Sequence, residues 1–248
     1  MPFNQRCSAG VRILLLVTLG LSPLANAEET NHPPAPVVAT KTKSAESDAE
    51  TKAAEWITTL KLDDAAKEAR VREVIATHLE TIRDWHNEHP YTNVTAGINP
   101  VTGKPLNELD RQIIADSALP KAVHSNLMAG LRQDLSAEQV EAVLDKYTVG
   151  KVAFTMNGYR AIVPDLTTNE AATIEGYLKQ AREEAVDYKN MKQISAIFEI
   201  YKTKSEQFLN SNGRSWKQLY KTYTDAIKAK KAAEKAAATT GTQTNIAR

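Results

Sequence analysis

The sequence contains little cysteine, glycine or aromatic residue, and it has no excess of charge of either sign. Its 248 residues include one cysteine and ten glycines, and aromatic residues make up 6% of the chain. The single cysteine, Cys7, excludes an intramolecular disulfide and any metal site that needs several thiolate ligands. With 31 basic and 30 acidic side chains, the chain lacks the positive charge typical of nucleic-acid-binding domains. We therefore expect no nucleic-acid partner.

Long apolar runs are also missing, except near the N-terminus. Arg6 and Arg12 come before the apolar segment 13–24, and Ala25-Asn26-Ala27 has the small-x-small pattern of a cleavage site. The apolar segment is shorter than the roughly 20 residues that a resident membrane-spanning helix needs. We therefore predict a signal peptide over residues 1–27, cleavage after Ala27, and export to the periplasm or the extracellular space. An uncleaved N-terminal anchor is the alternative.

The rest of the composition favours helices. Few glycines and aromatic residues, together with many Ala, Glu, Lys and Leu residues, are typical of all-α proteins. Residues 28–52 contain three prolines and a polar run without apolar periodicity, which predicts a disordered linker. Residues 53–238 are predicted to form a single-domain helical bundle of about seven to eight amphipathic helices, arranged as αα-hairpins. Residues 239–248 are predicted to be a disordered tail, and no transmembrane segment is expected after signal cleavage.

The clearest periodicity lies between residues 165 and 209. Thr167 and Glu170 have the spacing of a capping box, in which each side chain bonds a backbone N–H at the helix start. Apolar residues then recur with helical spacing over 174–185 and again over 194–208. This pattern predicts an αα-hairpin. Ser136 and Gln139 repeat the capping box, and segment 149–163 fits either a strand or a helix, of which we expect a helix because its neighbours are helical.

The segment 91–105 is predicted to be a loop because it contains two prolines and two glycines. Its length of about 15 residues is unusual for a simple connection, which raises the question of a functional role.

A charged cluster is the first candidate site. Arg182, Glu183, Glu184 and Asp187 follow one another along a predicted helix, and Lys202 lies on the next one. These side chains could converge in a cleft as an acid/base or sugar-binding group. The alternative is a solvated helix face with ion pairs between neighbouring turns. The sequence contains no nucleophile elbow, phosphate-binding loop or recognisable catalytic triad, so we expect a non-catalytic protein and assign no catalytic residue.

Two histidines and three tryptophans are weaker candidates. His86 and His89 lie one turn apart, a spacing that can hold a metal ion, but they could equally cap the end of a helix. No third ligand with matching spacing follows, so we expect no metal and no cofactor. Trp56, Trp85 and Trp216 lie on apolar helix faces, and we expect core burial rather than a sugar-stacking platform.

The C-terminal part of the domain is lysine-rich over residues 202–235. It could contact an anionic component of the cell envelope, although a solvated Ala/Lys helix is the simpler interpretation.

Several motifs together resemble a known family. They comprise 60–71 (LKLDDAAKEARV), His86, Val149-Gly150-Lys151 with Tyr159, Pro164–Thr167, Ala181–Asp187, Ile197-Phe198 and Tyr201-Lys202. This pattern resembles a domain-of-unknown-function family of secreted, all-helical bacterial proteins, often associated with plant-polysaccharide utilisation. The resemblance implies no known activity. We take Lys151, Tyr159, Arg182, Asp187 and Lys202 as candidate binding residues.

Three functional hypotheses remain. The first is a secreted binding or accessory protein whose partner is a glycan or an envelope component. The second is a periplasmic chaperone or envelope-stress protein of the LTxxQ type, because Leu precedes a capping residue at Leu62-Asp63-Asp64, Leu135-Ser136-Ala137 and Leu166-Thr167-Thr168. Any capped helix with a hydrophobic staple can show the same pattern. The third is an enzyme of unrecognised type. The resemblance favours the first hypothesis.

Overall fold

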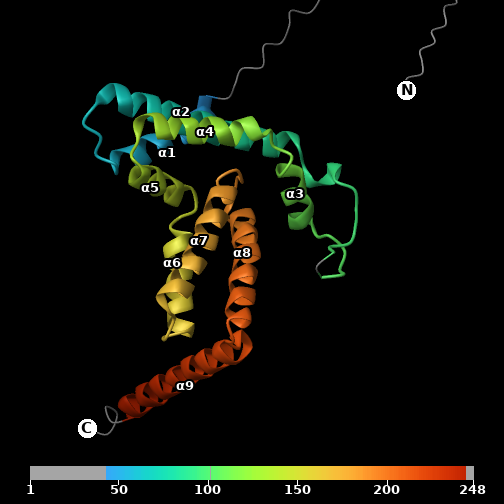
Figure 1. Cartoon of the computed structure of the whole chain (residues 1–248), viewed down its shortest axis with the longest axis vertical. Coiled ribbons are helices and arrows are strands. Elements are labelled where there is room, and N and C mark those ends of the chain that lie inside the picture. Colours follow the sequence, from blue (N-terminus) through green and yellow to red (C-terminus); the bar gives the residue numbers. More distant parts are fainter. Residues whose placement is uncertain (1–42, 101, 244–248) are drawn as a thin grey trace, which may run out of the picture. The chain divides into compact units, whose positions relative to one another are not determined.

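The computed structural model describes residues 43–100 and 102–243, and it describes burial and side-chain contacts over 48–100 and 102–235. This part of the chain belongs to one compact unit and contains nine α-helices (Figure 1). They are α1 (Lys43–Thr58), α2 (Ala65–Glu88), α3 (Glu108–Asp116), α4 (Lys121–Asp134), α5 (Ala137–Tyr147), α6 (Lys151–Ile162), α7 (Thr168–Ala185), α8 (Met191–Ser211) and α9 (Trp216–Gln243). The predicted all-α fold class is confirmed, with nine helices in the described residues rather than seven to eight.

Two predicted boundaries are wrong. Helix α1 begins at Lys43, inside the predicted linker 28–52, and Ala49 on it is buried. Ala49, Ala53 and Ile57 recur every four residues, but alanines give a weak hydrophobic signal from sequence. Helix α9 likewise continues to Gln243, past the predicted end at residue 238. The predicted signal peptide, residues 28–42 of the linker and residues 244–248 of the tail lie outside the described residues.

The two predicted capping boxes are confirmed. Ser136 with Gln139 and Thr167 with Glu170 form complete capping boxes at the starts of α5 and α7. The ambiguous segment 149–163 forms helix α6. Segment 91–105, apart from residue 101, which is not described, contains no α-helix. It begins with the short 3₁₀ helix η1 (Tyr91–Asn93) and closes with an isolated bridge between Ile98 and Pro105.

Buried apolar residues gather in two clusters. The first joins α1, α2, α4 and α5, and its fully buried members include Ile57, Val71, Ile75, Leu127, Leu131 and Leu144. Helices α1 and α2 pack along each other, and α4 lies against α2 (Figure 1). Each large apolar side chain that is fully buried contributes about 1.5–3 kcal/mol relative to exposure. The first cluster is therefore a substantial core.

The second cluster lies between α6, α7 and α8. It buries Met156, Tyr159, Ile174, Leu178, Ile197, Phe198 and Leu209. Helices α7 and α8 run side by side as the predicted αα-hairpin (Figure 1). The first residues of α9 add Trp216 and Leu219 to the margin of this cluster. Because α9 reaches the cluster only with its first turns, a recess remains between α9, α6 and α8.

No helix in the described ranges is both long enough and apolar enough to cross a bilayer.

A tight contact between α4 and α2 gives a stability prediction. A Cβ atom added to Gly130 of α4 would lie 2.6 Å from Cγ2 and 2.9 Å from Cγ1 of Val74 on α2. Because valine cannot withdraw both methyl groups by rotation, we expect Gly130→Ala to lower the free energy of unfolding by about 1–3 kcal/mol. Urea denaturation measures this change.

Gly176 in α7 is the matched control, since a Cβ there would meet nothing within 4 Å. Gly176→Ala should raise the free energy of unfolding by up to about 1 kcal/mol, because alanine is the better helix former. Equal stability of the two variants would contradict the close α2–α4 contact.

Candidate functional site

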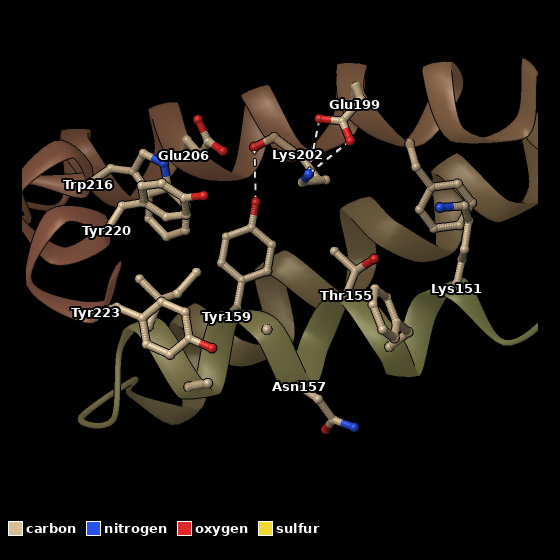
Figure 2. A pocket seen from close by; sticks show the side chains of 15 residues that line it. Lys151, Thr155, Asn157, Tyr159, Glu199, Lys202, Glu206, Trp216, Tyr220 and Tyr223 are labelled. Atoms are coloured by element: carbon tan, nitrogen blue, oxygen red, sulfur yellow. Dashed lines mark hydrogen bonds and ion pairs between the residues drawn. The ribbon is translucent and has the colours of Figure 1, made fainter. Parts of the chain in front are cut away.

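A groove of about 690 Å³ opens between α6, the middle of α8 and the start of α9 (Figure 2). This volume falls within the roughly 300–1,000 Å³ that small-molecule sites usually have. The side chains along it are mainly aromatic or polar: Lys151, Phe154, Thr155, Asn157, Tyr159, Glu199, Lys202, Glu206, Trp216, Tyr220 and Tyr223.

The turn between α8 and α9 sets the angle at which α9 borders the groove. Gly213 in this turn has a φ of +83°, a conformation that glycine adopts without strain. The Asn210 side chain accepts a hydrogen bond from the Trp216 backbone N–H at 2.9 Å. Arg214 then binds Glu170 at 2.7 Å and Asp165 at 2.9 Å, which ties the turn to the start of α7.

These bonds shift the pKa of their partners. The Arg214 guanidinium beside Glu170 lowers the pKa of that carboxyl from 4.5 to about 2. The ion pair thus persists over the whole physiological pH range, and the turn that positions α9 is held by charge as well as by its glycine.

Aromatic rings form one side of the groove in a continuous row. The Tyr159 and Trp216 ring centroids are 5.3 Å apart, and those of Trp216 and Tyr220 are 6.0 Å apart. Tyr159 is buried, and its hydroxyl donates to the Lys202 carbonyl at 3.1 Å, which links α6 to α8 (Figure 2). Burial raises the pKa of Tyr159, so its hydroxyl stays protonated. Tyr220 and Phe154 are 51% and 77% exposed, which is unusual for large aromatic residues.

Charged side chains also line the groove. Lys202 Nζ binds both carboxylate oxygens of Glu199, at 2.9 and 3.0 Å. Lys151 Nζ lies 5.5 Å from the centre of the Phe198 ring, a cation–π distance. Burial, with the nearby Glu199 charge, raises the pKa of Glu206, although Lys202 acts in the opposite direction. The groove therefore combines ring faces with hydrogen-bonding groups of both charges.

The structure brings together three of the five candidate binding residues. Lys151, Tyr159 and Lys202 all line the groove. Arg182 and Asp187 lie elsewhere, so the predicted convergence of Arg182, Asp187 and Lys202 in one cleft does not occur.

Arg182 connects two helices in the interior. Its side chain is 3% exposed and binds Glu141 at 2.6 Å and Asp145 at 2.7 Å, both on α5. It is therefore neither a solvated surface residue nor a groove residue, and its position indicates a structural role in joining α7 to α5.

Asp187, just after α7, joins two histidines that the sequence did not single out. His78 Nε2 on α2 donates to Oδ1 at 3.1 Å, and His124 Nδ1 on α4 donates to Oδ2 at 3.0 Å. The Asp187 hydrogen bond raises the pKa of His124 above 6.5. Burial acts to raise the pKa of Asp187, but the bonds from His124 and His78 outweigh it and leave the value below 3.8. The result is a charged, partly buried pair.

His86 and His89 have separate partners. His86 Nδ1 donates to the buried Asp116 carboxylate at 2.7 Å. His89 Nδ1 donates to the Trp85 carbonyl at 2.8 Å, and its ring stacks on the Trp85 ring at 3.8 Å. His89 thus caps the end of α2, the simpler of the two interpretations. Among the described residues no group of three or more His, Cys, Asp or Glu side chains could hold a metal ion.

Sequence reasoning missed part of the groove. Trp216, Tyr220 and Tyr223 have i, i+4, i+7 spacing, which would have shown an aromatic stripe on α9. Trp216 was expected in the core; it is half-buried, so it both packs against the second cluster and lines the groove. Glu199, Glu206 and Phe154 carried no signal beyond their residue type.

Comparison with protein families gives one match. The family model described as "Protein of unknown function (DUF3826)" matches residues 46–229. No curated protein matches the chain. The match confirms the predicted resemblance to a family of unknown function, whereas secretion and the link to polysaccharides stay predictions.

The position of Arg182 predicts that its removal lowers the stability of the fold. Arg182→Ala should lower the free energy of unfolding by about 2–4 kcal/mol, because it removes a buried side chain and two ion pairs. Thermal or urea denaturation measures the loss. Lys179→Ala is the control: Lys179 also binds Glu141, but it is 46% exposed, so a change below about 0.5 kcal/mol is expected. Equal stability of the two variants would contradict the structural role.

The Asp187–histidine contacts predict a pH-dependent stability. His124, whose pKa is raised, stabilises the fold fully below 6.5, and this contribution is lost as pH rises through its folded value. Asp187, whose pKa is lowered, contributes above 3.8 and loses its contribution as pH falls through its folded value. Asp187→Asn should therefore cost roughly 1.5–3 kcal/mol near pH 5.5 and less at pH 9.

Urea denaturation at both pH values tests this difference. Asp84→Asn is a suitable control, because Asp84 is 47% exposed and its ion pair is with Arg83 rather than with His78 or His124. A loss for Asp187→Asn that is equal at pH 5.5 and pH 9 would contradict the charged pair.

Proposed function

Since the chain belongs to the DUF3826 family of proteins of unknown function, we propose a function from its own groove: it is an exported, non-catalytic protein that binds glycans. The observation that carries the proposal is the row Tyr159–Trp216–Tyr220 beside Lys202 and Glu199.

The chemistry of a sugar fits this arrangement. A pyranose ring presents C–H groups on its faces and hydroxyl groups around its edge. The C–H groups can pack on exposed aromatic faces such as that of Tyr220. The hydroxyl groups can form hydrogen bonds with the lysine and glutamate side chains. Apolar ring surface that is exposed to water is unfavourable in free energy, so a ligand that covers it is stabilised by its burial.

Two further observations support the proposal. The segment 1–27 has the pattern of an export signal, which would place the groove where extracellular polysaccharides are found. The motifs at Lys151, Tyr159 and Lys202, which carried the resemblance to proteins of plant-polysaccharide utilisation, supply groove residues. The groove contains no recognisable nucleophile arrangement, which favours binding over catalysis.

A glycan array of pectic and hemicellulosic oligosaccharides, followed by isothermal titration with the best binder, tests this function. Tyr220→Ala should weaken binding roughly five- to tenfold, because a lost ring stack is worth about 1–1.4 kcal/mol. Lys202→Met should weaken it by a similar factor through the loss of a charged hydrogen bond.

Two substitutions outside the groove serve as controls. Ile200→Ala matches Tyr220, since both residues are 51% exposed, and Lys192→Met changes a lysine near the start of the same helix as Lys202. Both should leave glycan affinity unchanged. A blank array, or equal losses in the control variants, would contradict glycan binding in this groove.

A further inference from the structure

A second cavity lies away from the groove, where the segment between α3 and α4 meets the C-terminal end of α7 and the first half of α8. Its volume is about 650 Å³, and it is lined mainly by polar side chains. Those that matter here are Asp116, Lys121, His124, Glu183, Glu184 and Tyr188. It also includes Asp187, whose bonds to His78 and His124 are described above.

The cavity has more negative than positive groups. Asp116, Glu183, Glu184 and Asp187 carry carboxylates, while the positive charge among the lining residues comes from Lys121 and, when its ring is protonated, from His124. His124 is hydrogen-bonded to Asp187, so even a protonated His124 leaves Lys121 against the remaining three acids. Because the walls exclude part of the solvent, such an excess attracts a positively charged ligand.

The carboxylates differ in whether they are free to bind. Asp116 is buried and accepts hydrogen bonds from His86, Gln112 and Gln193. Glu184 is exposed, and within the described ranges its one hydrogen bond comes from the Tyr201 hydroxyl, at 2.8 Å on Oε2. Glu183 has His124 Nε2 at 3.7 Å, beyond hydrogen-bond distance. Glu183 and Glu184 can therefore accept further hydrogen bonds, whereas Asp116 and Asp187 form a fixed acidic wall.

Tyr188 is an independent sign of a ligand. The residue is 7% exposed, and no hydrogen bond to its hydroxyl is found among the described residues. The hydroxyl is nevertheless not sealed, since the fully enclosed unpaired polar atoms in the described part of the chain belong to His78, Tyr147 and Arg182. Tyr188 is one of the residues that line the cavity. Its hydroxyl has no protein partner among the described residues, so it can form a hydrogen bond with a ligand there.

The charges around the Tyr188 hydroxyl affect its pKa. Burial, followed by the charges of Glu184, Asp116 and Asp187, raises the pKa of Tyr188 to about 12. Its neutral hydroxyl thus lies near three carboxylates and can accept a hydrogen bond from a cationic donor.

We propose that this cavity binds a small organic cation through a primary ammonium group, with Glu184 and Glu183 as counter-ions and the Tyr188 hydroxyl as an acceptor. An ammonium offers three donors and one positive charge. It matches both the acidic excess and the unpaired hydroxyl, which a neutral polyol or an anion would not. The ammonium can belong to a linear diamine or to an amino sugar.

Isothermal titration of the full chain with matched pairs of probes tests the proposal. 1,4-Diaminobutane and glucosamine carry the ammonium; 1,4-butanediol and glucose are their neutral counterparts. At least one amine should bind saturably, and at least tenfold more tightly than its neutral counterpart. The stronger of the two amines identifies the source of the ammonium. Equal binding of an amine and its neutral counterpart, or no saturable heat from either amine, would overturn the proposal.

Two conservative variants locate the binding. Glu184→Gln should weaken amine binding at least tenfold, and Tyr188→Phe at least threefold, with thermal melts confirming that each variant is folded. Glu175→Gln is the matched control on α7, since Glu175 binds Lys179 and does not line the cavity. Unchanged affinity in both cavity variants, or an equal loss in Glu175→Gln, would refute this site.

The site is separable from the glycan groove. Tyr220→Ala should leave amine binding unchanged, and Glu184→Gln should leave glycan binding unchanged. The two proposals can therefore fail independently.

Discussion

The packing of α7 between its neighbours is the constraint on which the remaining structure depends. Ile174, Leu178, Ala181 and Ala185 are all fully buried and recur at helical spacing, so one face of α7 contributes to the second cluster along its length. The two alanines allow a neighbouring backbone to approach closely. Val186, the next residue, already belongs to the first cluster.

The polar groups at the end of α7 fix this arrangement. Arg182 binds α5, and Asp187 binds His78 of α2 and His124 of α4. Apolar burial is non-directional and would tolerate several positions of α7 relative to the first cluster. Ion pairs and hydrogen bonds are directional, and leaving them unpaired in the interior is costly. They therefore select one position, and with it the placement of both cavities.

The two cavities differ in chemistry because they use different parts of the helices. The groove lies beside the middle of α8 and the start of α9, where rings at i, i+4 and i+7 leave an aromatic surface. The acidic cavity lies at helix ends, where Asp116, Tyr188 and the α7 glutamates meet. Helix ends concentrate polar side chains, because there the backbone groups need partners. The chain thus has a groove lined by aromatic rings and a separate cavity lined by acidic side chains.

The sequence by itself determined the all-α class and the starts of α5 and α7, because capping and apolar periodicity are local: Thr167 with Glu170 defines the start of α7 whatever α7 packs against. Of the five candidate binding residues taken from the sequence, Lys151, Tyr159 and Lys202 line one groove. Only the tertiary structure decided that Arg182 is buried against α5, that Asp187 meets two histidines, and that Lys202 lines a groove together with residues of α9. The Arg182 and Asp187 contacts join residues 37 to 109 positions apart, and the direction of a polar side chain across such a distance depends on the packing of whole helices rather than on any local pattern.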